Sequence, residues 1–438
     1  MRRKATRLPE DIQELDPSVL SAEAKALESW LLSKIIGQDK AISQLVKVYQ
    51  HMKVGLNRDN RPLGVFLFAG PTGTGKTECV KQVAKFLLGN ENAITRIDCG
   101  EFQERHEVSK LIGAPPGYVG YSEQSSVRLA QENVDKFQTP ENKINILLFD
   151  EIEEAHDALF GAILQILDAG RLTLGSGKTT DFTKTIVVMT SNIGERETQN
   201  KLAGKTLGLA VGKEAAATDD DIYRLSKQAA TKHFKAKFMN RIDRVIVFRA
   251  LAQESLMTIL NNELNGIQAR IWHSAYRNWE AGGKVGSVPF FRPSIKVTDA
   301  AKTFLLAEGT DQKYGARELN RALDRFVVFP IGSLIGSKQI AADDIIQIDH
   351  EEGKKKLTFR RIGKRDLKAL QPAPEPKEPE PSEPNEPKEP KEAKEKKSSP
   401  KNSNDMWKEL NKFQEYCDYW KNAPIYKPPP PSRKPYGK

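Results

Sequence analysis

A chain of 438 residues is long enough for two or three domains and a sizeable hydrophobic core. Its formal net charge of +10 raises the question of a nucleic-acid partner, but in the part expected to fold the basic residues are mixed with Asp and Glu, which favours an ordinary charged surface. No apolar run has the length of a membrane span, and the basic N-terminus lacks the apolar segment of a signal peptide. The three cysteines show no metal-site spacing, so we expect reduced thiols and a cytoplasmic protein.

The beginning of the chain, residues 1–34, is polar and has a helical pattern, so we expect a helical lead-in there. Between residues 35 and 249, strand-like apolar runs alternate with helical patterns. The expected strands are Val65–Phe68, Ile94–Cys99, Ile144–Phe149, Thr185–Met189 and Val245–Phe248. This alternation predicts an α/β domain, with a parallel sheet and helices on both of its faces.

A phosphate-binding motif follows the first expected strand. It fits the pattern G-x-x-x-x-G-K-[ST] and reads Gly70-Pro71-Thr72-Gly73-Thr74-Gly75-Lys76-Thr77. A helical pattern comes next, so the glycine-rich turn connects a strand to a helix N-terminus, where backbone N–H groups can converge on phosphate. Lys76 would reach the β- and γ-phosphates, and the Thr77 hydroxyl would bind Mg²⁺. The motif therefore predicts a site for a nucleoside triphosphate.

Polar residues at the ends of the later strands are candidates for catalysis. Asp150 and Glu151 end the third apolar run; Asp150 would hold Mg²⁺, and Glu151 would activate the attacking water as a general base. Asn192 follows the next strand and could position this water or touch the γ-phosphate, although Ser-Asn pairs are also common in simple turns. Arg241 precedes the last strand and is a candidate arginine finger, a cation that stabilises the developing charge on phosphate.

Residues 250–360 read as several helices followed by a short strand pair, 344–349 and 356–359. This pattern predicts a smaller, mostly helical domain.

The remainder of the chain has a different composition. Residues 361–404 are mostly Pro, Glu and Lys, cannot bury enough apolar surface to fold, and predict a disordered linker. Prolines at every third position would line one edge of an extended spacer: Pro381, Pro384, Pro387 and Pro390. In residues 405–438, helical spacing favours an amphipathic docking helix before a Pro-rich end, and a disordered tail with scattered aromatic residues is the alternative. The apolar face would comprise Trp407, Leu410, Phe413, Cys417 and Trp420.

Taken together, these motifs resemble those of an AAA+ ATPase of the Clp unfoldase family, specifically the second ATPase module of ClpA, ClpB and ClpC. The resemblance extends over about residues 36–359. It implies an AAA+ P-loop module in residues 35–249, a small and mostly helical lid domain in residues 250–360, and binding of ATP with Mg²⁺. Besides the nucleotide motifs, it rests on Ile36-Gly37-Gln38, which would lie beside the adenine, the stretch from Leu111 to Tyr121, Gly170-Arg171-Leu172-Thr173, and Tyr314-Gly315-Ala316-Arg317.

The resemblance also implies roles for the matched residues. Asp150 and Glu151 would form the Walker B pair. Asn192 would be the first sensor of the nucleotide, and Arg317 the second. Arg241 would be the finger that reaches the nucleotide of a neighbouring subunit. A finger that acts in trans requires a closed head-to-tail ring, and the family implies a homo-hexamer.

One matched loop would contact the polypeptide substrate. Tyr118 would offer a large, sequence-tolerant contact to an extended chain in the pore of the ring, and the flanking glycines would free the loop backbone. Packing of Tyr118 in a core is disfavoured by the Pro-Pro-Gly before it and the glycine that soon follows. The expected pore loop is Gly117, Tyr118, Val119 and Gly120.

These features favour an ATP-dependent protein unfoldase that threads polypeptide through its pore. The alternatives are an AAA+ motor that acts on nucleic acid and a remodeller of one dedicated partner complex. The tripeptide Leu207-Gly208-Leu209 lies where family members that feed a ClpP-like peptidase carry their docking motif, but a match of three residues favours an ordinary loop, and peptidase docking is the minority hypothesis. The C-terminal tail is our candidate for binding an adaptor.

Overall fold

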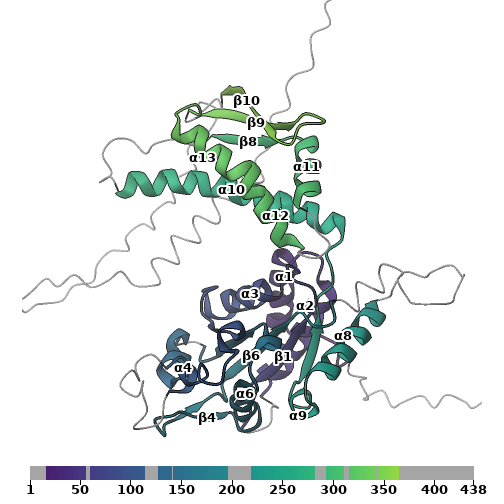
Figure 1. Ribbon diagram of the computed structural model, residues 1–438, viewed down its shortest axis with the longest axis vertical. Helices are drawn as coiled ribbons and strands as arrows, with labels where there is room; N and C mark the ends of the chain where they lie inside the picture. The colour runs from purple at the N-terminus through teal and green to yellow at the C-terminus, as the bar shows by residue number, and fades with distance from the viewer. Residues whose placement is uncertain are drawn as a thin grey trace, which may run out of the picture. The chain divides into compact units, whose positions relative to one another are not determined.

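The computed structural model describes residues 16–55, 60–113, 127–140, 142–195, 219–281, 293–309, 315–341 and 343–364 (Figure 1). All of them belong to one compact unit, Met1–Leu370.

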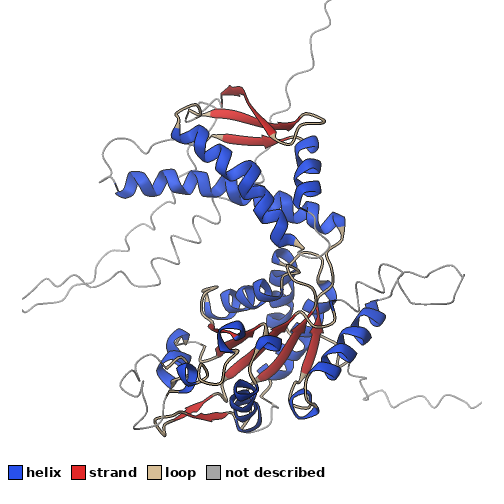
Figure 2. Cartoon of the chain, viewed as in Figure 1, coloured by secondary structure: helices blue, strands red, loops and turns tan. Residues whose placement is uncertain are grey.

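The first part of this unit is built on a five-stranded parallel sheet (Figure 2). Its order is β2-β3-β6-β1-β7, so the strand before the phosphate-binding motif lies between two strands that come much later in the chain. The predicted parallel sheet is confirmed, and each expected strand is present with its ends shifted by at most a few residues. The strands are β1 (Gly64–Ala69), β2 (Thr95–Asp98), β3 (Asn145–Asp150), β6 (Thr185–Ser191) and β7 (Arg244–Val247).

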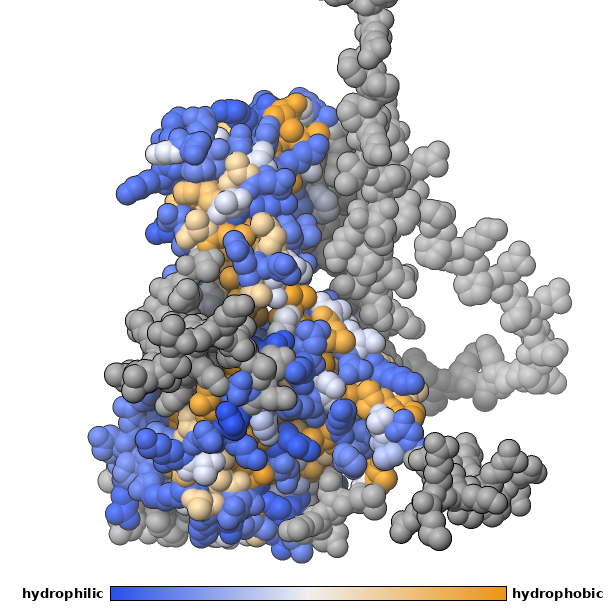
Figure 3. Space-filling model, turned by 90° about the vertical axis from the view of Figure 1, so that its right-hand side faces the viewer, coloured by the Kyte–Doolittle hydropathy of each residue, from blue (hydrophilic) through white to orange (hydrophobic). Residues whose placement is uncertain are grey.

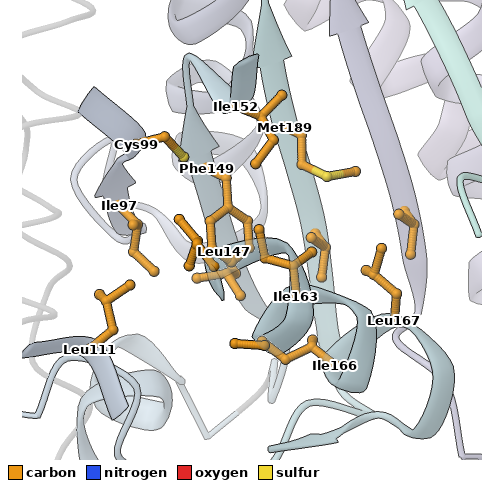
Figure 4. Close-up of a cluster of buried hydrophobic side chains, with 14 of the residues drawn as sticks. Ile97, Cys99, Leu111, Leu147, Phe149, Ile152, Ile163, Ile166, Leu167 and Met189 are labelled. Carbon is orange, nitrogen blue, oxygen red and sulfur yellow. The ribbon is translucent and has the colours of Figure 1, made fainter. Parts of the chain in front are cut away.

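Helices cover both faces of this sheet because alternate residues of each strand point to opposite sides. On one side, Phe66 and Phe68 pack with apolar residues of α1 (Ala22–Lys34), α2 (Asp39–Lys53) and α3 (Lys76–Leu88). On the other side, Val65 and Leu67 belong to a second cluster with α6 (Asp157–Ala169), α8 (Asp219–His233) and α9 (Ala236–Met239). Figure 4 shows part of this second cluster, in which Leu147, Phe149 and Met189 face Ile163 of α6.

The segment expected to be a polar lead-in contributes to the core. α1 begins after Ser21, whose hydroxyl caps the helix by accepting the backbone N–H of Ala24 at 3.2 Å. Leu27 and Leu31 of α1 are fully buried in the cluster with α2 and α3. α1 is therefore an integral layer of the sheet domain.

Short elements connect the main strands. They include two small antiparallel strands that the apolar pattern did not predict, β4 (Arg171–Thr173) and β5 (Thr179–Asp181). The other short elements are η1 (Cys99–Phe102), α4 (Ser109–Ile112), α5 (Gln131–Val134), η3 (Asp135–Phe137) and η4 (Ile152–Glu154).

The second part of the unit combines helices with a three-stranded sheet and has an apolar cluster of its own. The predicted strand pair is confirmed as antiparallel β9 (Asp344–His350) and β10 (Leu357–Lys364). A third strand, β8 (Ser294–Val297), pairs in parallel with β9 and was not predicted. The helical elements are α10 (Gln253–Ala281), α11 (Asp299–Gly309), α12 (Ala316–Leu323), the π-helical turn η5 (Asp324–Val328) and α13 (Phe329–Gly336).

The surface fits the mixed charge of the sequence. Hydrophilic residues predominate among the described residues on the face drawn in Figure 3, and apolar residues form separate patches. None of the described helices combines the length and apolar character that crossing a bilayer requires. Cys79 and Cys99 are buried free thiols, and burial raises the pKa of both.

Candidate active site

The phosphate-binding motif forms a tight turn between β1 and α3. All three of its glycines have positive φ angles, 143° at Gly70, 73° at Gly73 and 96° at Gly75, which residues with a side chain rarely adopt. At Gly70 the chain also approaches its neighbour closely, because an added Cβ would lie 2.2 Å from the carbonyl oxygen of Phe248. The turn ends at the N-terminus of α3, which begins at Lys76. Such a turn directs backbone N–H groups toward an anion.

A cavity of about 410 Å³ lies over this turn and the carboxyl ends of β3 and β6. It falls in the range of sites for small ligands. Predicted site residues that line it are Ile36, Thr72, Gly73, Thr74, Gly75, Lys76, Thr77, Asp150, Glu151, Asn192 and Arg317. The structure therefore brings together residues from the motif, two further strands and the second part of the unit.

Lys76 is a half-buried cation in this cavity. Its ammonium group donates hydrogen bonds to the carbonyl oxygens of Gly70 at 2.6 Å and Pro71 at 2.8 Å. Desolvation lowers the pKa of Lys76 to about 8, although the nearby carboxylates of Glu153, Glu195 and Asp150 act in the opposite direction. An anion in the turn would favour the charged form and raise this pKa again. The chemistry of the site thus fits a phosphate chain.

Asp150 lies at the end of β3 and is surrounded by hydrogen-bond donors. Its Oδ1 accepts from the hydroxyls of Thr190 and, at 3.3 Å, Thr77, and its Oδ2 accepts from Nη2 of Arg96 at 2.7 Å. The described residues contain no cluster of three or more His, Cys, Asp or Glu that could hold a metal by itself. A Mg²⁺ ion at Thr77 and Asp150 would therefore take most of its ligands from phosphate and water, which is its usual preference.

Glu151 follows Asp150 at a bend in the backbone. Its φ angle of 55° is in the left-handed region, and its backbone N–H donates to the Thr190 hydroxyl at 3.0 Å. Partial desolvation raises the pKa of Glu151, and the negative charges of Asp150 and Glu153 add to this effect. A carboxylate with a raised pKa is better suited to accept a proton from water.

Asn192 is held in place by a residue that sequence reasoning missed. The backbone N–H of Asn192 donates to Oε1 of Glu153 at 2.9 Å, and the other oxygen of Glu153 is buried without a hydrogen-bond partner among the described residues. Arg96 was missed as well. Its contact depends on the pairing of β2 with β3, which no spacing in the sequence reveals.

The motif around Arg317 lies against the phosphate-binding turn. The backbone N–H of Ala316 donates to the carbonyl oxygen of Gly73 at 3.2 Å. Gly315 has a φ angle of 54°, and a Cβ there would lie 2.9 Å from the carbonyl oxygen of Thr72. This close approach places the first turn of α12 over the site, where Arg317 lines the cavity.

The three residues expected beside the adenine, 36–38, have different roles. Ile36 lines the cavity, whereas Gly37 has a φ angle of 75° and a Cβ there would lie 2.6 Å from the hydroxyl of Ser255. Gln38 is buried, and its amide group donates to the carbonyl oxygens of Thr74 at 3.1 Å and Arg249 at 2.9 Å. Its Oε1 accepts the backbone N–H of Arg249 at 3.0 Å. Gln38 thus braces the phosphate-binding turn.

Two groups of predicted residues lie elsewhere. Arg241 is not part of the cavity lining; it forms an ion pair with Asp168 and donates to the carbonyl oxygen of Lys237. The expected pore loop Gly117–Gly120, the tripeptide at 207–209 and the whole tail fall outside the described residues.

Comparisons with known proteins agree with this geometry. Residues 61–245 match the family described as AAA domain (Cdc48 subfamily), and residues 292–348 match the C-terminal, D2-small domain, of ClpB protein. The chain is 37% identical over 329 residues to an "ATP-dependent Clp protease ATP-binding subunit ClpA homolog" of Cyanidium caldarium, which covers 75% of this chain and 35% of the relative.

Two bacterial relatives carry a different name. The chain is 36% identical to a "Chaperone protein ClpB" of Rhodopirellula baltica and 38% identical to one of Clostridium perfringens. Each match covers 75% of this chain, and 33% and 34% of the respective relatives. The chain spans about a third of the length of the curated relatives it matches.

Proposed function

We propose that this chain, which belongs to the Clp family of AAA+ ATPases and corresponds to their second ATPase module, is an ATP-driven protein unfoldase or remodeller. The observation that carries the proposal is the cavity in which Lys76, Glu151 and Arg317 converge. A cation, a carboxylate with a raised pKa and a second cation are the groups that hydrolysis of a phosphoanhydride needs.

In the proposed reaction, the backbone of the turn and Lys76 bind the β- and γ-phosphates of ATP. Glu151 accepts a proton from the attacking water, and Asn192 orients this water or the γ-phosphate. Arg317 contributes positive charge near the phosphates. Mg²⁺, held by Thr77 and Asp150, would offset negative charge on the phosphate oxygens.

Arg241 is proposed to act on a neighbouring subunit. It is absent from the cavity of its own chain, so a contribution to catalysis requires a second copy. A head-to-tail arrangement of identical subunits forms a ring when the rotation between neighbours closes, and we propose such a ring, a homo-hexamer.

We propose that substrate polypeptide passes through the pore of this ring. Tyr118 would grip it, and Gly117, Val119 and Gly120 would shape the loop. The relatives are named both as a subunit of a protease and as a chaperone, so the threaded chain is degraded or released according to the partner. Leu207-Gly208-Leu209 is a candidate contact for a ClpP-like peptidase, and the C-terminal tail is a candidate contact for an adaptor. The buried thiols suit a cytoplasmic location.

The proposal is tested by the ATPase rate with and without casein, an unstructured protein, in the full chain and in Tyr118→Ala. We expect casein to stimulate the wild type, and we expect this stimulation to disappear in Tyr118→Ala while the basal rate is kept. Tyr223→Ala is the matched control, because Tyr223 lies in α8 and does not line the cavity. It should respond to casein as the wild type does.

Other outcomes would favour the alternatives. An ATPase that ignores casein and the Tyr118 substitution contradicts threading. Stimulation of the ATPase by DNA instead would favour a nucleic-acid motor, an alternative with which the net charge of +10 is consistent. The third outcome is that one protein alone stimulates the ATPase, and that this protein no longer binds after deletion of residues 405–438. This result would favour remodelling of one dedicated partner.

A further inference from the structure

Asp150 has a cationic partner that the proposed reaction does not use. Arg96 of β2 forms an ion pair with it, with 2.7 Å between Nη2 and Oδ2. The pairing of β2 with β3 explains the contact, because Asp98 lies opposite Asp150 in the sheet and Arg96 lies two residues earlier on the same face of β2. The arginine side chain is long enough to extend along this face to the carboxylate.

The hydrogen bonds of Asp150 leave little room for a further cation. Thr77 and Thr190 donate to Oδ1, and Arg96 donates to Oδ2. The Asp150 side chain is only 9% exposed, so its charge interacts strongly with whichever cation lies beside it. Arg96 and a Mg²⁺ ion at Asp150 would carry charges of the same sign in the same small space and would repel each other.

Arg96 has a second acidic neighbour to which it can move. Its Nη2 lies 3.9 Å from Oδ2 of Asp98, whose side chain is 45% exposed. The Arg96 side chain is itself 53% exposed, so no packed core opposes its movement. A shift of the guanidinium from Asp150 to Asp98 would free Oδ2 and keep an ion pair.

We infer that Arg96 is a positioning residue that competes with Mg²⁺ for Asp150. In the nucleotide-free protein it neutralises and orients the carboxylate, and it yields to the metal ion that arrives with nucleotide, moving toward Asp98. This inference rests on the proposed function, because it assumes a Mg²⁺–nucleotide site. It predicts that Arg96 raises the Mg²⁺ concentration that the site requires.

The test is the Mg²⁺ dependence of nucleotide binding, which needs no turnover. Binding of a fluorescent ADP analogue to the full chain is titrated with Mg²⁺, and Mn²⁺ binding in the presence of ADP is followed by electron paramagnetic resonance. For Arg96→Gln we expect half-saturating metal concentrations about two- to fivefold lower, the size of effect expected for removing one partly exposed charge. Arg96→Lys keeps the charge and should stay close to the wild type.

Arg128→Gln is the matched control for a general effect of lost charge. Arg128 pairs with Glu101 at 2.9 Å, has a similar exposure of 46%, and does not line the cavity. This variant should leave the metal requirement unchanged. Thermal unfolding of all three variants reports any loss of structure. If Arg96→Gln is unstable, Arg96→Met, which also removes the charge, replaces it in the test.

The results separate failure of the inference from failure of the proposed function. An Arg96→Gln protein that binds the analogue but needs as much Mg²⁺ as the wild type, or more, overturns the competition. A wild-type protein that binds no nucleotide at any metal concentration overturns the proposed function, and the inference with it.

Discussion

Desolvation of the Lys76 ammonium group lowers the free energy of unfolding of the ligand-free protein. The pKa of Lys76 in the folded chain is lowered to about 8, mainly by desolvation, whereas a lysine in an unfolded chain titrates near 10.4. Between these values the unfolded state binds more protons, so the free energy of unfolding rises with pH in this window. Below about pH 8 both states are protonated, and the full cost of burying the charge is present.

This shift predicts the pH dependence of nucleotide binding. As the pH rises through about 8, the free protein loses the proton that a bound phosphate requires, so affinity should fall by up to about tenfold per pH unit. In Lys76→Met, binding should be weaker at neutral pH and this dependence should be absent. The dissociation constant of ADP, measured by calorimetry from about pH 7 to about pH 10, checks the prediction. Parallel pH profiles for the two proteins would contradict it.

Among the secondary-structure elements, the start of α2 supports the site through Gln38. This side chain makes three hydrogen bonds, to the carbonyl oxygen of Thr74 in the phosphate-binding turn and to both backbone groups of Arg249 after β7. It thereby connects three segments that lie far apart in the sequence. A buried amide with all these bonds made is expensive to remove, because its backbone partners lose their own pairing.

We therefore expect Gln38→Leu to lower the free energy of unfolding by about 2–4 kcal/mol, since several buried polar groups are left unpaired. The KM for ATP should rise, because the phosphate-binding turn loses its support. Urea denaturation and steady-state kinetics measure the two effects. Gln44→Leu in α2 is the control: Oε1 of Gln44 is already buried without a hydrogen-bond partner among the described residues, so this change should cost little. Equal losses in both variants would argue against the brace.

The sequence predicts some elements of the fold and of the site and misses others. Apolar runs such as Val65–Phe68 predict the strands well because the central sheet is buried on both faces. β4 and β5 were missed because each has three residues with one buried position, too short for an alternation to be recognised. The glycine-rich motif predicts the turn, but the contact of Arg96 with Asp150 arises from the pairing of neighbouring strands. Only the three-dimensional structure reveals such contacts.

At the scale of the whole molecule, the position of Arg241 makes a prediction about assembly. Arg241→Ala and Glu151→Gln should each reduce the ATPase rate by about a hundredfold or more, because one removes the cationic finger and the other the general base. In a head-to-tail ring, an Arg241→Ala subunit would keep Glu151 and receive Arg241 from a Glu151→Gln neighbour. An equal mixture of the two variants should therefore recover roughly a quarter of the wild-type rate if subunits assemble at random.

Mixing after dissociation at low protein concentration, followed by an ATPase assay, measures this recovery. Each variant mixed with wild type at the same ratio is the control for subunit exchange. A finger that acts within its own chain gives no recovery, because neither variant then contains a complete site. Arg241→Ala also removes the ion pair with Asp168, so thermal unfolding of this variant is measured alongside the assay.

The order of the strands has a consequence for synthesis on the ribosome. β1 lies between β6 and β7, yet both of these strands are translated long after it. Until they emerge, the apolar β1 has no strand partner, and an unpaired apolar strand on a growing chain is prone to wrong associations. The nucleotide site cannot mature while the nascent chain is short, because Asn192 and Arg249 emerge after the phosphate-binding turn. The five-stranded sheet can therefore be completed only after β7 has been translated.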